Sequence, residues 1–133
     1  MTENLTYLKI KFENFQKALN KLAKILNTNE EIEYRIDAII KRFEFTYELS
    51  WKFLKAFLEY KGILAKTPRD CFREAFAAGI IDDSEAWINM IEDRNITSHT
   101  YEEDSANEIY QKIEDIYFEK FKEVENYFLK EIQ

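Results

Sequence analysis

The sequence predicts an all-α protein, an antiparallel four-helix-type bundle with an additional short helix. Two glycines and one proline in 133 residues leave few places for the tight turns of a many-stranded sheet. Apolar residues instead recur at three- and four-residue steps over long stretches, as they do on one face of a helix. With 46% hydrophobic and 16% aromatic residues, we expect residues 1–133 to form one domain around a single core.

Charge and cysteine content narrow the class of protein. A formal net charge of −7 argues against a general nucleic-acid binder, which usually carries a large basic face, so any contact with RNA must be local. The single cysteine, Cys71, has no partner for an intramolecular disulfide. The first residues lack a signal-peptide pattern, and no apolar run approaches the roughly 18 residues needed to cross a bilayer. We therefore expect a cytoplasmic protein without membrane association.

The first two predicted helices are long. The first covers residues 5–26, where leucine and phenylalanine recur with the helical period, and a polar break follows. The second covers about residues 30–61. Alternation of apolar and polar residues from Phe43 to Phe53 would also suit a strand, but a helix explains more residues. In the helix the apolar face comprises Ile36, Ile39, Phe43, Tyr47, Trp51, Leu54 and Leu58, and a solvent stripe comprises Lys41, Glu44, Glu48, Lys52, Lys55 and Glu59.

A flanking face of the second helix carries further apolar residues, namely Phe45, Leu49, Phe53 and Phe57. A helix that is apolar over more than half of its circumference must be buried on two sides. Since isolated domains rarely expose a contiguous aromatic patch, these four residues predict an interface with a second chain, most simply in a homodimer.

The remaining helices are marked by their ends. Gly62 ends the long helix, and Thr67 and Pro68 begin a short one that runs to Ala78. After Gly79, residues 82–84 cap a helix that runs towards residue 96. The last helix follows residues 102–105 and keeps its apolar period to the C-terminus through Ile109, Ile113, Ile116, Phe121, Val124 and Phe128.

One stretch, residues 94–101, combines groups that suit a metal-independent ribonuclease. Arg94 can hold a phosphate with its planar fork of donors, and Asn95 can orient either the phosphate or His99. His99, the single histidine, suits the base that takes the RNA 2′-hydroxyl proton or the acid that protonates the leaving oxygen. Because one histidine cannot do both in a single step, a homodimer would supply the second.

This interpretation requires the side chains of Arg94 and His99 to lie close together. On an ideal helix Arg94 and His99 lie about 140° apart around the axis, so they converge only if the helix ends or distorts near residues 97–98. Threonine and serine there favour such an ending. The alternative is that Arg94, Asn95 and His99 cap helix carbonyls and Tyr101 packs. With no second histidine and no cysteine pair, we expect neither a metal site nor a cofactor.

Several segments resemble the nucleotidyltransferase substrate-binding subunit family, part of the HEPN superfamily. They are RFEFTYELSWK (residues 42–52), PR (68–69), REAF (73–76), Trp87 and RNITSHTY (94–101). The superfamily is marked by an arginine, a polar residue, and a histidine four to six positions on. The resemblance covers nearly the whole chain.

The resemblance implies an antiparallel helical bundle that forms homodimers and pairs with a small, separate nucleotidyltransferase. In the related HepT toxins the motif R-x4-H-x-Y serves RNA cleavage, and the partner attaches adenylate to the tyrosine. By position, Arg94, Asn95 and His99 would be catalytic and Tyr101 the modification site. Adenylate there would place negative charge and bulk over an arginine that otherwise receives RNA phosphate.

Two functions from different classes are compatible with these features. The first is a ribonuclease toxin, neutralised by the nucleotidyltransferase, and the intact motif at residues 94–101 favours it. The second is a non-catalytic subunit that binds substrate or serves as a scaffold for that enzyme. The acidic balance of the chain suits the second, because such a subunit works mainly through protein contacts.

Overall fold

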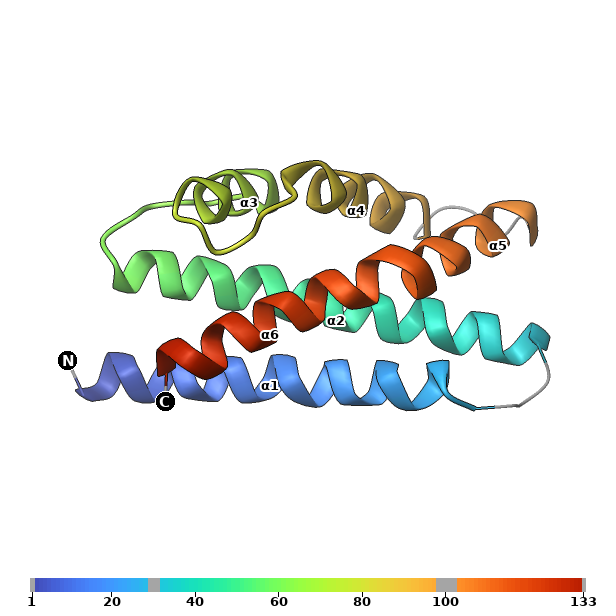
Figure 1. Ribbon diagram of the computed structural model, residues 1–133, viewed down its shortest axis with the longest axis horizontal. Coiled ribbons are helices and arrows are strands. Elements are labelled where there is room, and N and C mark those ends of the chain that lie inside the picture. The colour runs from blue at the N-terminus through green and yellow to red at the C-terminus, as the bar shows by residue number, and fades with distance from the viewer. Residues whose placement is uncertain (1, 29–31, 98–102, 133) are drawn as a thin grey trace.

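The computed structural model describes residues 2–28, 32–97 and 103–132, and within these ranges every regular element is a helix. The elements are α1 (Thr2–Leu26), α2 (Ile32–Tyr60), α3 (Pro68–Ala77), α4 (Ser84–Thr97), α5 (Glu103–Lys112), the π-helical segment η1 (Ile113–Tyr117) and α6 (Phe118–Ile132). Since α5, η1 and α6 follow one another without a break, they form one long last helix (Figure 1). The predicted all-α class is confirmed.

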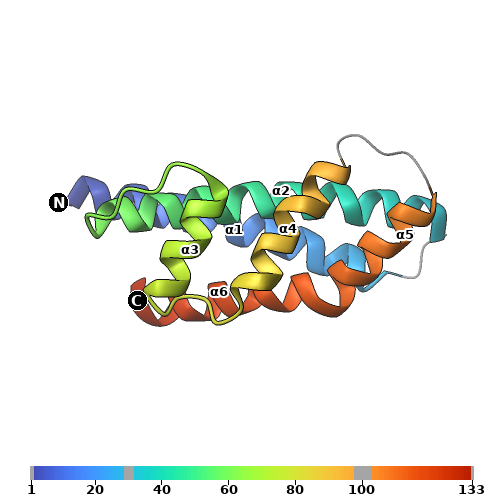
Figure 2. The same ribbon diagram turned by 90° about the horizontal axis from the view of Figure 1, so that it is seen from above.

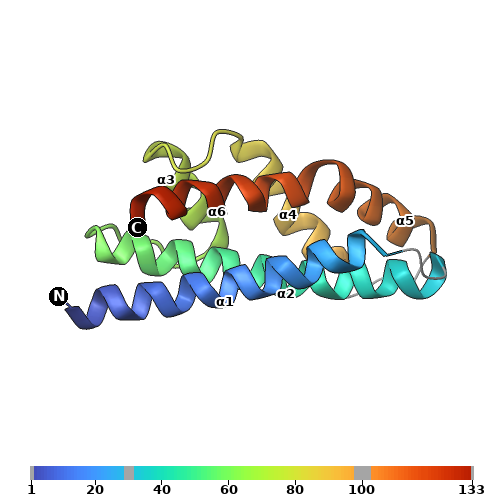
Figure 3. The same ribbon diagram turned by 60° about the horizontal axis from the view of Figure 1, so that its bottom comes forward.

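Helix α2 lies in the middle of the bundle. It runs antiparallel to α1, and α6 packs across this pair (Figures 1 and 3). On another side, α3 and α4 cross over α2 and α6 (Figure 2). As a result, α2 contacts α1, α3, α4 and α5. No helix in the described ranges is both long enough and apolar enough to cross a membrane.

Phenylalanine rings fill the core between α1, α2 and α6. The ring of Phe53 lies 4.5 Å from that of Phe128, nearly perpendicular to it, and stacks at 6.5 Å on Phe15. Trp87 brings α4 into the same cluster, with its ring edge-on to Phe121 at 5.6 Å. All five side chains are buried. Edge-to-face and offset pairs of this kind add to the stabilisation that burial alone provides.

The predicted ends of α2 and α3 and the predicted start of α4 are confirmed, whereas α5 already begins at Glu103, within the residues 102–105 that were expected to precede the last helix. Thr67 is the N-cap of α3, with its Oγ1 accepting the amide N–H of Asp70 at 3.1 Å. Gly62 follows α2 and Gly79 follows α3, with φ of +85° and +78°, the left-handed conformation in which a glycine avoids the Cβ clash. The side chain of Asp83 accepts the amide N–H of Ala86 and caps α4.

The flanking face of α2 is only partly available to a second chain. Phe53 is 0% and Phe57 8% exposed, and both rings pack on Phe128 of α6. Leu49 is half-buried against the core, whereas Phe45 remains 48% exposed. The predicted interface is therefore wrong for Phe53 and Phe57, because the last helix crosses α2 and covers that side from within the chain.

The last helix also departs from its predicted register. Ile116 was expected in the core but is 43% exposed, and Tyr117 is buried in its place. Four steps of an α-helix turn the chain about 40° past a full turn, so the buried residues Ile109, Ile113, Tyr117 and Phe121 would drift around a straight α-helix. The wider turn of η1 offsets this drift and keeps them facing the core.

Candidate functional site

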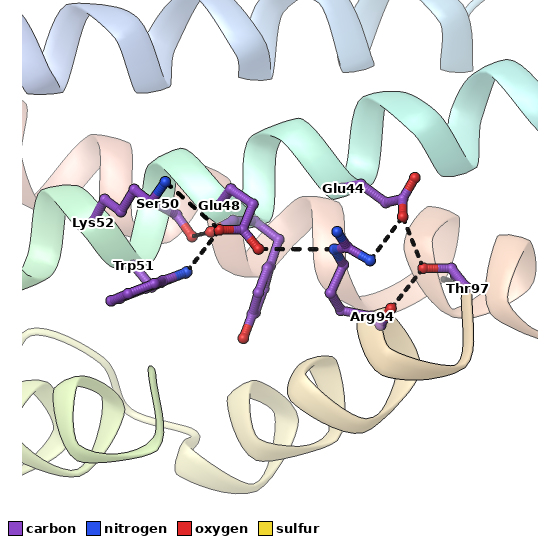
Figure 4. A network of polar contacts seen from close by, with 8 residues as sticks. Glu44, Glu48, Ser50, Trp51, Lys52, Arg94 and Thr97 are labelled. Atoms are coloured by element: carbon purple, nitrogen blue, oxygen red, sulfur yellow. Dashed lines mark hydrogen bonds and ion pairs between the residues drawn. The ribbon is translucent and has the colours of Figure 1, made fainter. Parts of the chain in front are cut away.

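The structure places Arg94 and Asn95 in the final turn of α4, and Arg94 lies beside α2 (Figure 4). Asn95 is exposed, and Arg94 is half-buried. His99 and Tyr101 lie outside the described residues. Helix α4 is described as far as Thr97, and the convergence of Arg94 with His99 stays a prediction.

Two glutamates of α2 bind the Arg94 guanidinium. Arg94 Nη1 lies 2.9 Å from Glu44 Oε2, and Arg94 Nε lies 3.8 Å from Glu48 Oε1 (Figure 4). Because Glu44 and Glu48 are four residues apart, both carboxylates project from the same face of α2. The side chains of Arg94 and Glu44 are only 25% and 17% exposed, so solvent screens this ion pair less than a surface pair.

Further hydrogen bonds extend this network in both directions. Thr97 Oγ1 lies 3.2 Å from Glu44 Oε2 and 2.8 Å from the carbonyl oxygen of Arg94. On the other side, Glu48 Oε2 accepts the indole N–H of Trp51 at 3.2 Å and lies 3.9 Å from Lys52 Nζ. The contacts therefore link about two turns of α2 to the final turn of α4 (Figure 4).

Asp93, the residue before Arg94, is bound by a different helix. Its carboxylate is buried, accepts a hydrogen bond from the Tyr117 hydroxyl of η1, and lies 3.3 Å from Lys112 Nζ. Burial, and secondly this bond to Asp93, raise the pKa of Tyr117 well above its usual range. Consecutive residues of α4 are thus bound by two different helices, which fixes the end of α4 between them.

Tyr47 of α2 is a second buried phenol near this network. Burial, and secondly the charge of Glu48, raise its pKa well above the usual range, while the charge of Arg94 partly opposes them. The phenol therefore stays neutral at physiological pH, and it belongs to the buried core.

Sequence reasoning missed Glu44 and Glu48 as site residues. It placed both in a solvent stripe, whereas both are half-buried because α4 crosses α2 at this point. The spacing of the two glutamates was visible in the sequence, as was the fact that Arg94 is the one basic residue of α4. Which helix would cover the stripe was not, since periodicity does not identify the neighbouring helix.

The side chains of this network determine which ligands it can bind. Within the described residues, no group of three or more His, Cys, Asp or Glu gathers closely enough to hold a metal ion. The network instead holds a guanidinium, the group best suited to bind phosphate or carboxylate in a fixed orientation. An anion that approaches Arg94 meets a cation whose charge Glu44 already offsets.

Comparisons with known proteins agree on one family. Residues 10–130 match the family described as nucleotidyltransferase substrate binding protein like. A Haemophilus influenzae protein named probable ribonuclease HepT is 39% identical over 89 residues, which are 63% of this chain and 61% of that protein. The chain therefore aligns with about three fifths of that relative's length.

Two solved structures share the fold. A crystal structure of a Thermus thermophilus protein has a TM-score of 0.78 at 30% identity, covering 90% of this chain and 98% of that one. A Haemophilus influenzae structure, described as revealing the fold of a substrate binding domain of a nucleotidyltransferase, has a TM-score of 0.69 at 29% identity, covering 92% and 96%. Because the family match also spans most of the sequence, the chain belongs to the nucleotidyltransferase substrate-binding protein-like family.

Proposed function

We propose that this chain is the helical partner subunit of a two-component system whose other member is a small nucleotidyltransferase. The family match over residues 10–130 supports this proposal, as does the solved relative described as a substrate binding domain of a nucleotidyltransferase. Co-expression with a nucleotidyltransferase encoded beside it should give a complex that co-elutes in size-exclusion chromatography. Separate elution of the two chains at micromolar concentration would contradict the proposal.

Within that system the chain acts as a metal-independent endoribonuclease, with Arg94, Asn95 and His99 as catalytic residues. The observation that carries this part is the guanidinium of Arg94, held in the final turn of α4, five residues before the single histidine. A base takes the 2′-hydroxyl proton, and the 2′-oxygen attacks the phosphorus. The bond to the 5′-oxygen breaks as an acid protonates that oxygen, and Arg94 stabilises the crowded phosphate. The products are a 2′,3′-cyclic phosphate and a 5′-hydroxyl.

A homodimer completes this chemistry. Each chain has one histidine, so a site that needs an acid and a base in one step draws His99 from two copies. Phe45, which is exposed, and Leu49, which is half-buried beside it on α2, are the predicted interface residues that a second copy can still reach.

Tyr101 is the residue through which the partner switches the site off. Its hydroxyl oxygen attacks the α-phosphorus of ATP, the bond to the β-phosphate breaks, pyrophosphate leaves, and a base takes the phenolic proton. The attached adenylate brings negative charge and bulk close to Arg94 in the sequence, where it competes with RNA phosphate.

Cleavage is tested with the purified chain, a labelled mixed-sequence RNA and EDTA. Wild type should yield cyclic-phosphate ends, His99→Ala should remove activity, and Arg94→Ala should leave only a slow residual rate, while the dimer persists in light scattering. Arg69→Ala, which changes an exposed arginine of α3, is the matched control and should cleave normally. Absence of cleavage by wild type would refute the ribonuclease.

Modification is tested separately by incubating the chain with its partner and ATP and measuring the intact mass. Wild type should gain one adenylate and lose cleavage, and Tyr101→Phe should gain none. The control Tyr34→Phe, at a 71% exposed tyrosine, should be modified like wild type. Adenylate on Tyr101→Phe would assign the modification to another residue.

A non-catalytic subunit is the second candidate, and the pairing of Arg94 with Glu44 favours it. A guanidinium offset by a carboxylate attracts RNA phosphate less than a bare one, and the chain as a whole carries a net charge of −7. This candidate predicts a stable complex with the nucleotidyltransferase and no RNA cleavage. It also predicts that the complex binds the enzyme's substrate more tightly than the enzyme alone, which calorimetry measures.

A further inference from the structure

We propose that Glu44 is a positioning residue that acts through Arg94, an inference that rests on the proposed RNA cleavage. Its carboxylate holds the guanidinium in one orientation against α2. The same oxygen, Oε2, lies 2.9 Å from Arg94 Nη1 and 3.2 Å from Thr97 Oγ1. One acceptor thus binds the side chains of two residues in the final turn of α4 (Figure 4).

The contact distances distinguish Glu44 from its neighbour. Glu48 approaches Arg94 only to 3.8 Å, beyond hydrogen-bond range, and its other oxygen accepts from Trp51. Glu44 therefore makes the short, charge-assisted contact, while Glu48 contributes mainly its charge.

The last helix holds α4 independently of Glu44. Asp93 is bound to Tyr117 and Lys112, so loss of the Glu44 carboxylate should leave the backbone of α4 in place. Loss of the carboxylate would instead allow the Arg94 side chain to adopt other orientations. A site whose groups are held in place before reaction favours the transition state, and misplacement by about 1 Å can cost about 100-fold in rate.

Glu44 should have opposite effects on the two measured quantities, because it favours the rate of cleavage but does not favour the binding of RNA phosphate. Its carboxylate offsets part of the Arg94 charge, so removing that charge should leave RNA affinity equal or higher. Glu44→Gln should therefore slow cleavage without weakening RNA binding. Unfolding of the site would weaken both.

A double-mutant cycle tests this role with labelled mixed-sequence RNA under single-turnover conditions. Glu44→Gln should lower the rate about 100-fold when Arg94 is present and change the residual rate by less than about twofold in the Arg94→Ala background. RNA affinity is measured by anisotropy with each variant in the His99→Ala chain. Glu59→Gln, the same charge change at an exposed position of α2, is the control. Equal losses in both backgrounds, or weaker RNA binding, would overturn the proposal.

A second readout needs no cleavage. In a nitrogen-15 spectrum the Nε–H signal of Arg94, identified by its absence in Arg94→Lys, should be sharp in wild type and broadened or exchanged in Glu44→Gln. An identical signal in both proteins would overturn the positioning role even if RNA is cut. If wild type does not cut RNA, the ribonuclease fails, and the spectrum still decides whether Glu44 restrains Arg94. Should Glu44→Gln lose helix content, Glu44→Asp, which shortens the side chain, provides the same comparison.

Discussion

Two buried tyrosines near the candidate site link stability to alkaline pH. Burial is the main reason that the pKa values of Tyr47 and Tyr117 are raised. In the unfolded chain both phenols ionise near pH 10, whereas in the folded chain they stay neutral to higher pH. The stability that depends on neutral phenols is therefore complete below about pH 10 and is lost as the pH rises above it.

We expect the free energy of unfolding to fall steeply above about pH 10 in urea titrations. Tyr47→Phe and Tyr117→Phe should each flatten that fall, because each removes one group whose pKa differs between the two states. Tyr34→Phe, at an exposed tyrosine, should not change it. Parallel curves for all variants would contradict the assignment.

Cys71 should be unreactive while the chain is folded. Its thiol is fully buried, and burial, opposed by the charge of Lys55, raises its pKa to about 11. Since the thiolate is the reactive form, a thiol-specific disulfide reagent at neutral pH should modify the native chain only at the rate of unfolding. Adding urea to the transition midpoint should accelerate the reaction, and rapid labelling of native protein would contradict this expectation.

At the scale of elements, the sequence predicted each helix and most of the helix ends, but it placed the start of the last helix after residues 102–105, whereas α5 begins at Glu103. Spacing located the long helices, and Thr67, Gly62 and Gly79 located the breaks, because caps and left-handed turns depend on local chemistry alone. It could not predict which helix would cover which face. In the sequence, Ile116 and Phe121 are five residues apart, which is a break in the three- and four-residue spacing of the last helix. Only the structure shows that a π-helical segment lies there and that Tyr117, rather than Ile116, is buried against α4.

The corrected role of the flanking face of α2 gives a paired test. Phe53→Ala should lower the free energy of unfolding by about 3–5 kcal/mol, because it empties a buried site between α1 and α6. Tyr34→Ala, on the same helix but 71% exposed, should change it by less than about 0.5 kcal/mol. Urea unfolding at neutral pH measures both, and similar losses would contradict the burial of Phe53 within the chain.

For the whole molecule, the candidate site shows what a single sequence conveys. It predicted Arg94, Asn95 and His99 as site residues by chemistry and by resemblance, and that assignment stays a proposal, whereas family membership is confirmed. It did not identify Glu44, because that glutamate contacts Arg94 only where α4 crosses α2. A residue whose role depends on a neighbour from another helix cannot be recognised from the spacing of apolar residues in its own helix.

The proposed homodimer makes a prediction about the surface of α2. Phe45→Glu should convert the dimer to a monomer in light scattering, because a charge replaces an apolar contact at the interface. It should also abolish cleavage while leaving helix content unchanged, since Phe45 is exposed in the isolated chain. A variant that stays dimeric would place the interface elsewhere.

The first turn of α1 and the last turn of α6 lie at the same end of the bundle, away from the final turn of α4 (Figures 1 and 2). A fluorescent protein or an affinity tag joined to either helix would therefore sit far from Arg94. Fusions at both helices at once would lie near each other, so a donor and acceptor pair would report unfolding as a loss of energy transfer. Such a double fusion would let folding be followed in living cells while the candidate site stays uncovered.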